Sequence, residues 1–257
     1  NLFETKVTGK GLVHCKEMKK LEHIGLWNTP CTGEGLQHLA GMTKITMLDL
    51  AETQLTDAGL ANIRTWTHLK KLNLSKTNVT DAGLIHLKGL AKLNTLVMKD
   101  SSLCGTGLVH LSGLASLERL ELPSANITDA SLVKLRGFPA LKELDITGAG
   151  ITDASLAVFT RFPLLESLNL TSTKITDAGL GALKACPALE SLMLTRTGIT
   201  DAALVTLKMF PKLTYVNVAG TKISRSASRA MNKNQLTLDV CMGWSFSGDG
   251  GYEWRRW

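Results

Sequence analysis

The sequence lacks the features that mark several large classes of protein. Its five cysteines are an odd number and show no disulfide framework. No apolar run approaches the roughly 18 residues that a membrane-spanning helix needs, so no membrane span is predicted. No Ser-His-Asp or Cys-His pairing stands in a recognisable catalytic context. These absences disfavour a disulfide-stapled domain, an integral membrane protein and the common hydrolases.

The most regular feature of the chain is a residue pattern that repeats at a fixed spacing. One position recurs every 24 residues without a slip, as Thr8, Thr32, Thr56, Thr80, Cys104, Thr128, Thr152, Thr176, Thr200 and Ser224. A spacing this regular indicates a solenoid of stacked repeats rather than a globule built around one pocket.

Residues 69–92 show what one repeat should fold into. Leu72 and Leu74 alternate, which predicts a short strand with one buried face. Further on, leucines at spacing three, at 84, 87 and 90, predict one stripe of a helix. Thr80 suits the N-cap of that helix, and Asp81 would face the positive end of the helix dipole. Stacked strand–helix units predict a parallel sheet on the concave side and helices on the convex side.

The repeat L-x-x-L-x-L-x-x-T-x-I-T-D-A-G-L resembles the leucine-rich repeat in its 24-residue form. Similar repeats are common in bacteria such as planctomycetes, and the cysteine-containing repeats of F-box adaptors have Cys where this chain has Thr. The resemblance covers about residues 1–235 and implies an α/β fold, a right-handed leucine-rich-repeat solenoid (horseshoe) of about ten repeats. Residues 236–257 are predicted to form a C-terminal edge strand and an aromatic capping tail.

Two further rows of the repeat predict structural roles. The threonines that follow the strands should form a ladder of buried hydroxyls, each bonded to a neighbouring repeat. The row comprises Thr5, Thr29, Thr53, Thr77, Ser101, Thr173, Thr197 and Thr221, with a gap at Ala125 and Ala149. A small residue always precedes the first helical leucine, which predicts a close approach of backbones, so Gly59→Val should overpack that joint.

Cysteine positions and the first residue carry two more expectations. Cys15, Cys31 and Cys186 fall in apolar registers and should behave as small core side chains, which favours a reducing compartment such as the cytoplasm. Asn1 stands in the register of Asn73, so half a repeat is missing, and we expect upstream sequence to precede it.

The basic charge of the chain, +7 overall, is predicted to lie mainly on the convex helices. One register holds Lys16, Arg64, Lys88, Arg136, Lys184 and Lys208, and another holds Lys20, Lys44, Lys92 and Lys212. These rows keep a rod soluble, or else they form a footprint for nucleic acid or an anionic surface. We expect the former, with nucleic acid an unlikely partner.

The concave strand face is the predicted binding surface, because it is polar and varies between repeats. Its candidate residues are Asp49, Asn73, Lys71, Val97, Arg119, Glu121, Glu143, Asp145, Asn169, Met193, Tyr215 and Asn217. Glu121, Glu143 and Asp145 form the densest acidic cluster, for which charge complementarity to a partner is favoured over acid–base catalysis or Ca²⁺ binding. The histidine row His14, His38, His86 and His110 is interpreted as repeat duplication, so no metal or cofactor is predicted.

Aromatic residues gather at the ends of the chain. Phe3 and Trp27 occupy a strand-edge register that is otherwise mostly small. The tail contains Trp244, Phe246, Tyr252, Trp254 and Trp257, and it should either cap the last repeat or dock on another chain. Trp27, Trp254 and Trp257 are therefore possible end contacts.

The sequence as a whole favours a non-enzymatic scaffold that binds a protein partner through its concave face. The alternative is a structural or surface-assembly module that packs through its ends or convex side. An enzyme or a nucleic-acid binder ranks third, and the functional part of this interpretation depends on analogy between folds.

Overall fold

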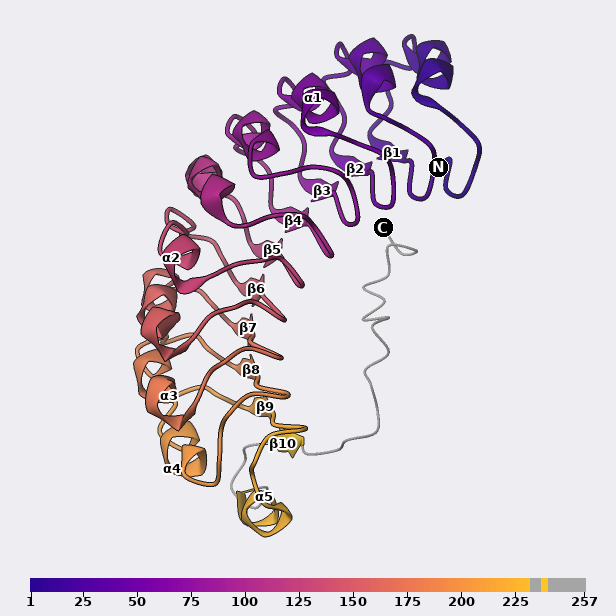
Figure 1. Ribbon diagram of the computed structural model, residues 1–257. Helices are drawn as coiled ribbons and strands as arrows, with labels where there is room; N and C mark the ends of the chain where they lie inside the picture. Colours follow the sequence, from indigo (N-terminus) through magenta and orange to yellow (C-terminus); the bar gives the residue numbers. More distant parts are fainter. Residues whose placement is uncertain (232–236, 240–257) are drawn as a thin grey trace.

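The computed structural model describes residues 1–231 and 237–239. These residues form one curved solenoid with strands on the inside and helices on the outside (Figure 1). The strands pair in parallel, in chain order, into a ten-stranded sheet. They are β1 (His23–Gly25), β2 (Met47–Asp49), β3 (Lys71–Asn73), β4 (Thr95–Val97), β5 (Arg119–Glu121), β6 (Glu143–Asp145), β7 (Ser167–Asn169), β8 (Ser191–Met193), β9 (Tyr215–Asn217) and β10 (Thr237–Asp239). The predicted concave sheet and convex helices are confirmed.

The convex helices are short, and most of them are 3-10 rather than α helices. The 3-10 helices are η1 (Gly9–Cys15), η2 (Glu34–Leu39), η3 (Ala61–Ile63), η4 (Gly83–Leu87), η5 (Thr106–Gly113) and η6 (Asp153–Arg161). The α-helices are α1 (Asp57–Leu60), α2 (Asp129–Leu132), α3 (Asp177–Leu183), α4 (Ala203–Leu207) and α5 (Arg225–Met231). Leucines at spacing three fit a 3-10 helix, which has three residues per turn, but α3 has the same spacing at Leu180 and Leu183, so the spacing alone does not decide between the two.

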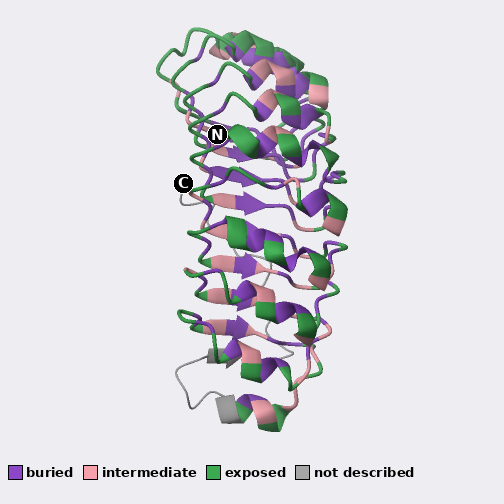
Figure 2. Ribbon diagram, turned by 90° about the vertical axis from the view of Figure 1, so that its left-hand side faces the viewer, coloured by how far each residue is buried: buried purple, intermediate pink, exposed green. Residues whose placement is uncertain are grey.

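The core fills the space between the two layers. The middle residue of each strand from β2 to β9 is buried, whereas exposed residues concentrate on the helices and turns (Figure 2). Backbone pairing continues beyond the three-residue strands: the N–H of Leu74 donates to the carbonyl of Val97, and the N–H of Lys76 donates to that of Lys99, both at 2.8 Å. Each repeat is therefore bonded to the next through its turn as well as through its strand.

A left-handed backbone residue ends the strand segment of every repeat. These residues have φ between 50° and 75° and are Glu4, Asn28, Glu52, Lys76, Asp100, Ser124, Gly148, Ser172, Arg196 and Gly220. This conformation costs a non-glycine residue roughly 1–2 kcal/mol. The hydrogen bonds to the next repeat hold it in place, and because eight of the ten are not glycine, the sequence carried no signal for this turn.

Aspartates link the start of one helix to the next repeat, a role that was not predicted and that adds to their place in the first helical turn. The carboxylate of Asp57 accepts hydrogen bonds from the backbone N–H and the hydroxyl of Thr80, at 2.8 and 2.7 Å. The Thr80 hydroxyl in turn accepts the N–H of Ala82 at 3.3 Å, so the predicted cap is present but long. The same link recurs at Asp129–Thr152, Asp153–Thr176, Asp177–Thr200 and Asp201–Ser224.

The threonines after the strands also bond differently from the prediction. Their hydroxyls donate to the carbonyl three residues earlier in the same repeat, as Thr77 does to Leu74 at 2.7 Å, and not to a neighbouring repeat. The buried Ser101 hydroxyl has no partner, so the row is interrupted there as well as at the two alanines. The predicted inter-repeat ladder is therefore wrong, and each threonine closes its own turn.

Two of the three cysteines assigned to the core lie there. Cys31 and Cys186 are buried, and burial raises the pKa of the Cys186 thiol to about 11. Cys15 packs against the core but is only half-buried, and it lies in the first repeat of the stack. Cys241 lies outside the described residues.

Candidate binding surface

The strand registers place the twelve predicted binding residues on the concave side in two columns. A first-residue column contains Lys71, Arg119, Glu143 and Tyr215, and the third-residue column contains Asp49, Asn73, Val97, Glu121, Asp145, Asn169, Met193 and Asn217. Trp27 begins a further column two residues on, with Lys99, Thr171 and Thr195, which the candidate list missed although their alternate spacing points to the same face. Trp254 and Trp257 lie outside the described residues.

The concave face is open in one half of the solenoid and closed in the other. Asp49, Asn73, Val97 and Glu121 are buried, with at most 6% of each residue exposed. Their counterparts in β6 to β9 are only half-buried. Side chains in register on parallel strands stand about 4.8 Å apart and can cover one another. The third-residue column of β2 to β5 is therefore closed to a partner, although the sequence analysis placed its residues among the binding candidates.

The polar residues of the third-residue column also support the backbone. At every Asp and Asn of this column the side-chain oxygen accepts the N–H two residues later, as Asn169 does from Thr171 at 3.0 Å. Asp49, Asn73, Asp145 and Asn217 make the same bond. Asp and Asn commonly bond to the backbone two residues on, so their recurrence at one register was an available signal for this role.

Ion pairs engage two of the three acids in the cluster at the centre of the face, Glu121 and Glu143. The two carboxylate oxygens of Glu121 contact Lys99 at 3.1 Å and Arg119 at 2.5 Å. Arg119 also contacts Glu143 at 2.9 Å. Because Glu121 is buried and paired twice, it offers no charge to a partner, whereas the side chain of Glu143 remains 46% exposed. The geometry supports a structural network here rather than acid–base chemistry.

Asp49 is a buried carboxyl group in the closed half. Burial raises its pKa to about 6, although hydrogen bonds from the Ala51 backbone and the Asn73 side chain partly offset the effect. Ionisation of Asp49 at neutral pH therefore destabilises the native state.

We predict that Asp49→Asn stabilises the protein by about 1–2 kcal/mol at pH 7.5, since a pKa unit corresponds to about 1.4 kcal/mol and relaxation removes part of it. The native pKa lies above the ordinary value of 3.8, so the penalty is absent below pH 3.8 and complete above pH 6. Asparagine already occupies this register at positions 73, 169 and 217. Urea unfolding at pH 7.5 and pH 3.5 measures the effect. An equal gain at both pH values would contradict it.

An aromatic pair marks the first end of the concave face. The rings of Phe3 and Trp27 meet edge to face with centroids 6.1 Å apart. Phe3 lies over Gly25, where any Cβ would collide with its ring. Both rings are half-buried, so this end of the face offers an aromatic contact surface.

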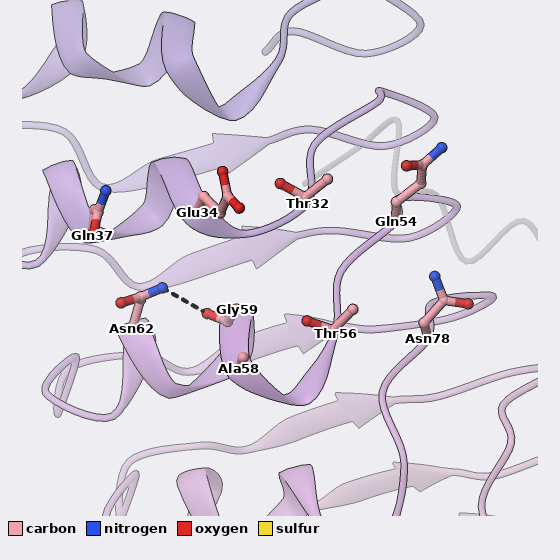
Figure 3. Close-up of a pocket in the computed structure, with 9 residues that line it drawn as sticks. All are labelled: Thr32, Glu34, Gln37, Gln54, Thr56, Ala58, Gly59, Asn62 and Asn78. Atoms are coloured by element: carbon pink, nitrogen blue, oxygen red, sulfur yellow. Dashed lines mark hydrogen bonds between the residues drawn. The ribbon is translucent and has the colours of Figure 1, made fainter.

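A hollow lies on the outer side near η2 and α1 (Figure 3). It is lined by Thr32, Glu34, Gln37, Gln54, Thr56, Ala58, Gly59, Asn62 and Asn78. Asn62 donates hydrogen bonds to the carbonyls of Gly33 and Gly59, at 3.1 and 3.2 Å. Amides and hydroxyls dominate the lining, and Glu34 adds one carboxylate.

Two searches of the described residues bear on other functions. Within residues 1–231 and 237–239, no group of three or more His, Cys, Asp or Glu side chains is placed to hold a metal ion. No helix in that part of the chain has the length and apolar character to cross a membrane.

Comparisons with known proteins agree with the architecture. Two family models described as leucine rich repeat match residues 67–88 and 139–199. An internalin (inlF) from Listeria monocytogenes str. 4b F2365 has a similar structure, with TM-score 0.50 and 17% identity over 89% of this chain and 83% of that one. Internalin C2 (inlC2) from the same strain gives TM-score 0.52 and 20% identity over 93% and 78%. No curated protein matches by sequence. From its repeats and its fold, the chain is a leucine-rich-repeat protein.

Proposed function

We propose that the chain is a non-enzymatic scaffold that recognises a protein partner through the open half of its concave face, from β6 to β9. One observation carries the proposal. Within the described residues, the hydroxyls of Ser167, Thr171 and Ser191 form no hydrogen bond, and they share the concave side of the β7 and β8 repeats with the half-exposed Met193. Methionine is enriched in protein interfaces, and hydroxyls without an internal partner are available to hydrogen-bond with another chain.

The shape of this surface favours a macromolecule over a small ligand. The four strands span roughly 15 Å at about 4.8 Å spacing and form an open sheet face. Small molecules usually bind in pockets that enclose most of their surface. Tyr215 and Glu143 flank the strip and can contribute an aromatic and a charged contact. Glu121 and Asp49 are excluded as contacts by their burial.

The experiment compares capture by two charged variants. We predict that Ser191→Arg combined with Met193→Arg abolishes capture of the proteins that the wild-type chain retains from an extract of its source cells, because two guanidinium groups block the strip. The matched control is Val205→Arg on α4, where the valine is 70% exposed on the convex side. Quantitative mass spectrometry reads both. If the concave variant keeps the same proteins, the partner binds elsewhere.

A further inference from the structure

The topology gathers one set of segments along a single edge of the solenoid. All strands run in the same direction, so every segment that returns from a helix to the next strand lies on the same side. Figure 2 shows the strand arrows pointing the same way across the molecule. We name this side the return edge, and it comprises residues 16–22, 40–46, 64–70, 88–94, 112–118, 136–142, 160–166, 184–190 and 208–214.

The return edge carries the positive charge of the chain. Its nine segments hold 14 lysines and arginines against five acids, whereas the nine helical segments before them hold two bases and seven acids. The predicted basic convex face is therefore corrected, because the basic rows begin at the helix C-caps and continue into the return segments. Among the pairs in the described part of the chain, the edge contributes one ion pair, Lys142 with Glu118.

The charge is densest in the first four return segments. They contain eight exposed bases, Lys16, Lys19, Lys20, Lys44, Arg64, Lys70, Lys88 and Lys92, and two acids, Glu17 and Glu22. The other three acids, Glu118, Glu166 and Glu190, lie in the second half. Like charges held this close repel one another, which an anionic partner would relieve.

The shape of the edge selects the kind of anion. The solenoid curves in the plane of Figure 1, and seen from the side it is an upright column that the strands cross (Figure 2). The return segments consequently form a flat strip rather than a groove. Such a strip fits an extended planar surface, whereas a strand of nucleic acid is usually held in a positively charged groove.

The side chains between the bases also favour a lipid surface over nucleic acid. Met18, Leu164 and Met209 are exposed on this edge, at 53%, 47% and 61%. Its Trp and Phe residues, Trp66, Phe138, Phe162 and Phe210, are all buried, which leaves His68 as the one exposed aromatic ring among the described residues of the edge. Exposed apolar side chains beside basic residues can enter the interface of an anionic bilayer while the basic residues contact its headgroups.

We propose that the return edge docks on the surface of an anionic lipid bilayer. The strands would then stand upright on the membrane, and the concave face would open parallel to it, accessible to a partner. Lipid attraction and partner recognition use different sides, so this inference does not depend on the proposed function.

The test is sedimentation with vesicles of phosphatidylcholine that contain about one third phosphatidylserine. Each basic residue near such a surface strengthens binding several-fold, so the triple variant Lys44→Gln/Lys70→Gln/Lys92→Gln should weaken partitioning on the order of 100-fold. The control Lys174→Gln/Arg196→Gln/Lys222→Gln removes the same charge from the opposite edge and should leave partitioning within a few-fold of wild type. Binding should also fall as salt is raised.

Three results would overturn the proposal. The first is no sedimentation of the wild-type chain with acidic vesicles at low salt. The second is an equal loss in both triple variants, which would mean that net charge alone acts. The third is tighter binding to single-stranded or duplex nucleic acid than to vesicles at the same salt, which would assign the edge to nucleic acid.

Discussion

Gly59→Val is expected to lower the free energy of unfolding by about 3 kcal/mol, at the upper end of overpacking effects. A Cβ at Gly59 would lie 2.8 Å from the carbonyl oxygen of Thr32 and 2.9 Å from both the Cα of Gly33 and the Cδ1 of Leu55. Two of these atoms are backbone of the preceding repeat, so they cannot move without separating the stack. Urea unfolding followed by circular dichroism measures the loss.

Gly181 supplies the matched control for this prediction. It also lies inside a helix, α3, but a Cβ there would meet no atom within 4 Å. Gly181→Ala should therefore gain up to about 1 kcal/mol from helix propensity, while Gly59→Ala should lose stability despite the same gain. If the two alanine variants changed stability equally, the close approach of repeats at Gly59 would not matter.

Asp57→Ala should cost about 2–3 kcal/mol, the second largest effect expected. The substitution removes the acceptor of two hydrogen bonds from Thr80 in the next repeat, and bonds to charged groups contribute roughly 1.5–3 kcal/mol each before solvent screening. Since Asp57 is half-buried and Thr80 exposed, the sum is discounted. Thermal and urea unfolding at neutral pH report the change.

A double-mutant cycle separates this link from other roles of Asp57. Asp57→Asn keeps an acceptor for the Thr80 N–H, so it should lose only about half of the free energy of unfolding that Asp57→Ala loses. Thr80→Val removes the hydroxyl but leaves the N–H bond, so its cost should shrink in the Asp57→Ala background. Strict additivity of the two substitutions would show that Asp57 acts through its own helix instead.

Most of the fold was predictable because each repeat has the same pattern of apolar residues. The 24-residue period predicted parallel strands inside and helices outside, and the alternation of Leu72 and Leu74 located the strand. Leucines at spacing three predicted the helices but did not distinguish 3-10 from α geometry, because repeats of both kinds have them. The left-handed turn was not predictable, because residues as different as Lys76, Ser172 and Arg196 adopt it, held by bonds to the following repeat.

The candidate surface was predictable in position but not in availability. Strand alternation placed Asp49, Glu121 and Asp145 on the concave side, as the registers show. Whether each side chain is free to contact a partner depends on its neighbours. Glu121 forms ion pairs with Lys99 and Arg119, and Asp49 is buried. Those neighbours lie 22 to 24 residues away or two residues along, and their contacts appear only when the repeats are stacked.

By itself, the sequence determined which residues share a row, because a fixed period keeps every register in phase from Thr8 to Ser224. Tertiary structure decided what each row faces. Parallel strands with a uniform direction bring the helix-to-strand segments to one edge, so lysines read along the chain as part of the helices become a flat basic strip. The aspartates of the helix starts became links between repeats for the same reason. A side chain's partner in a solenoid is set by the stack, one period away.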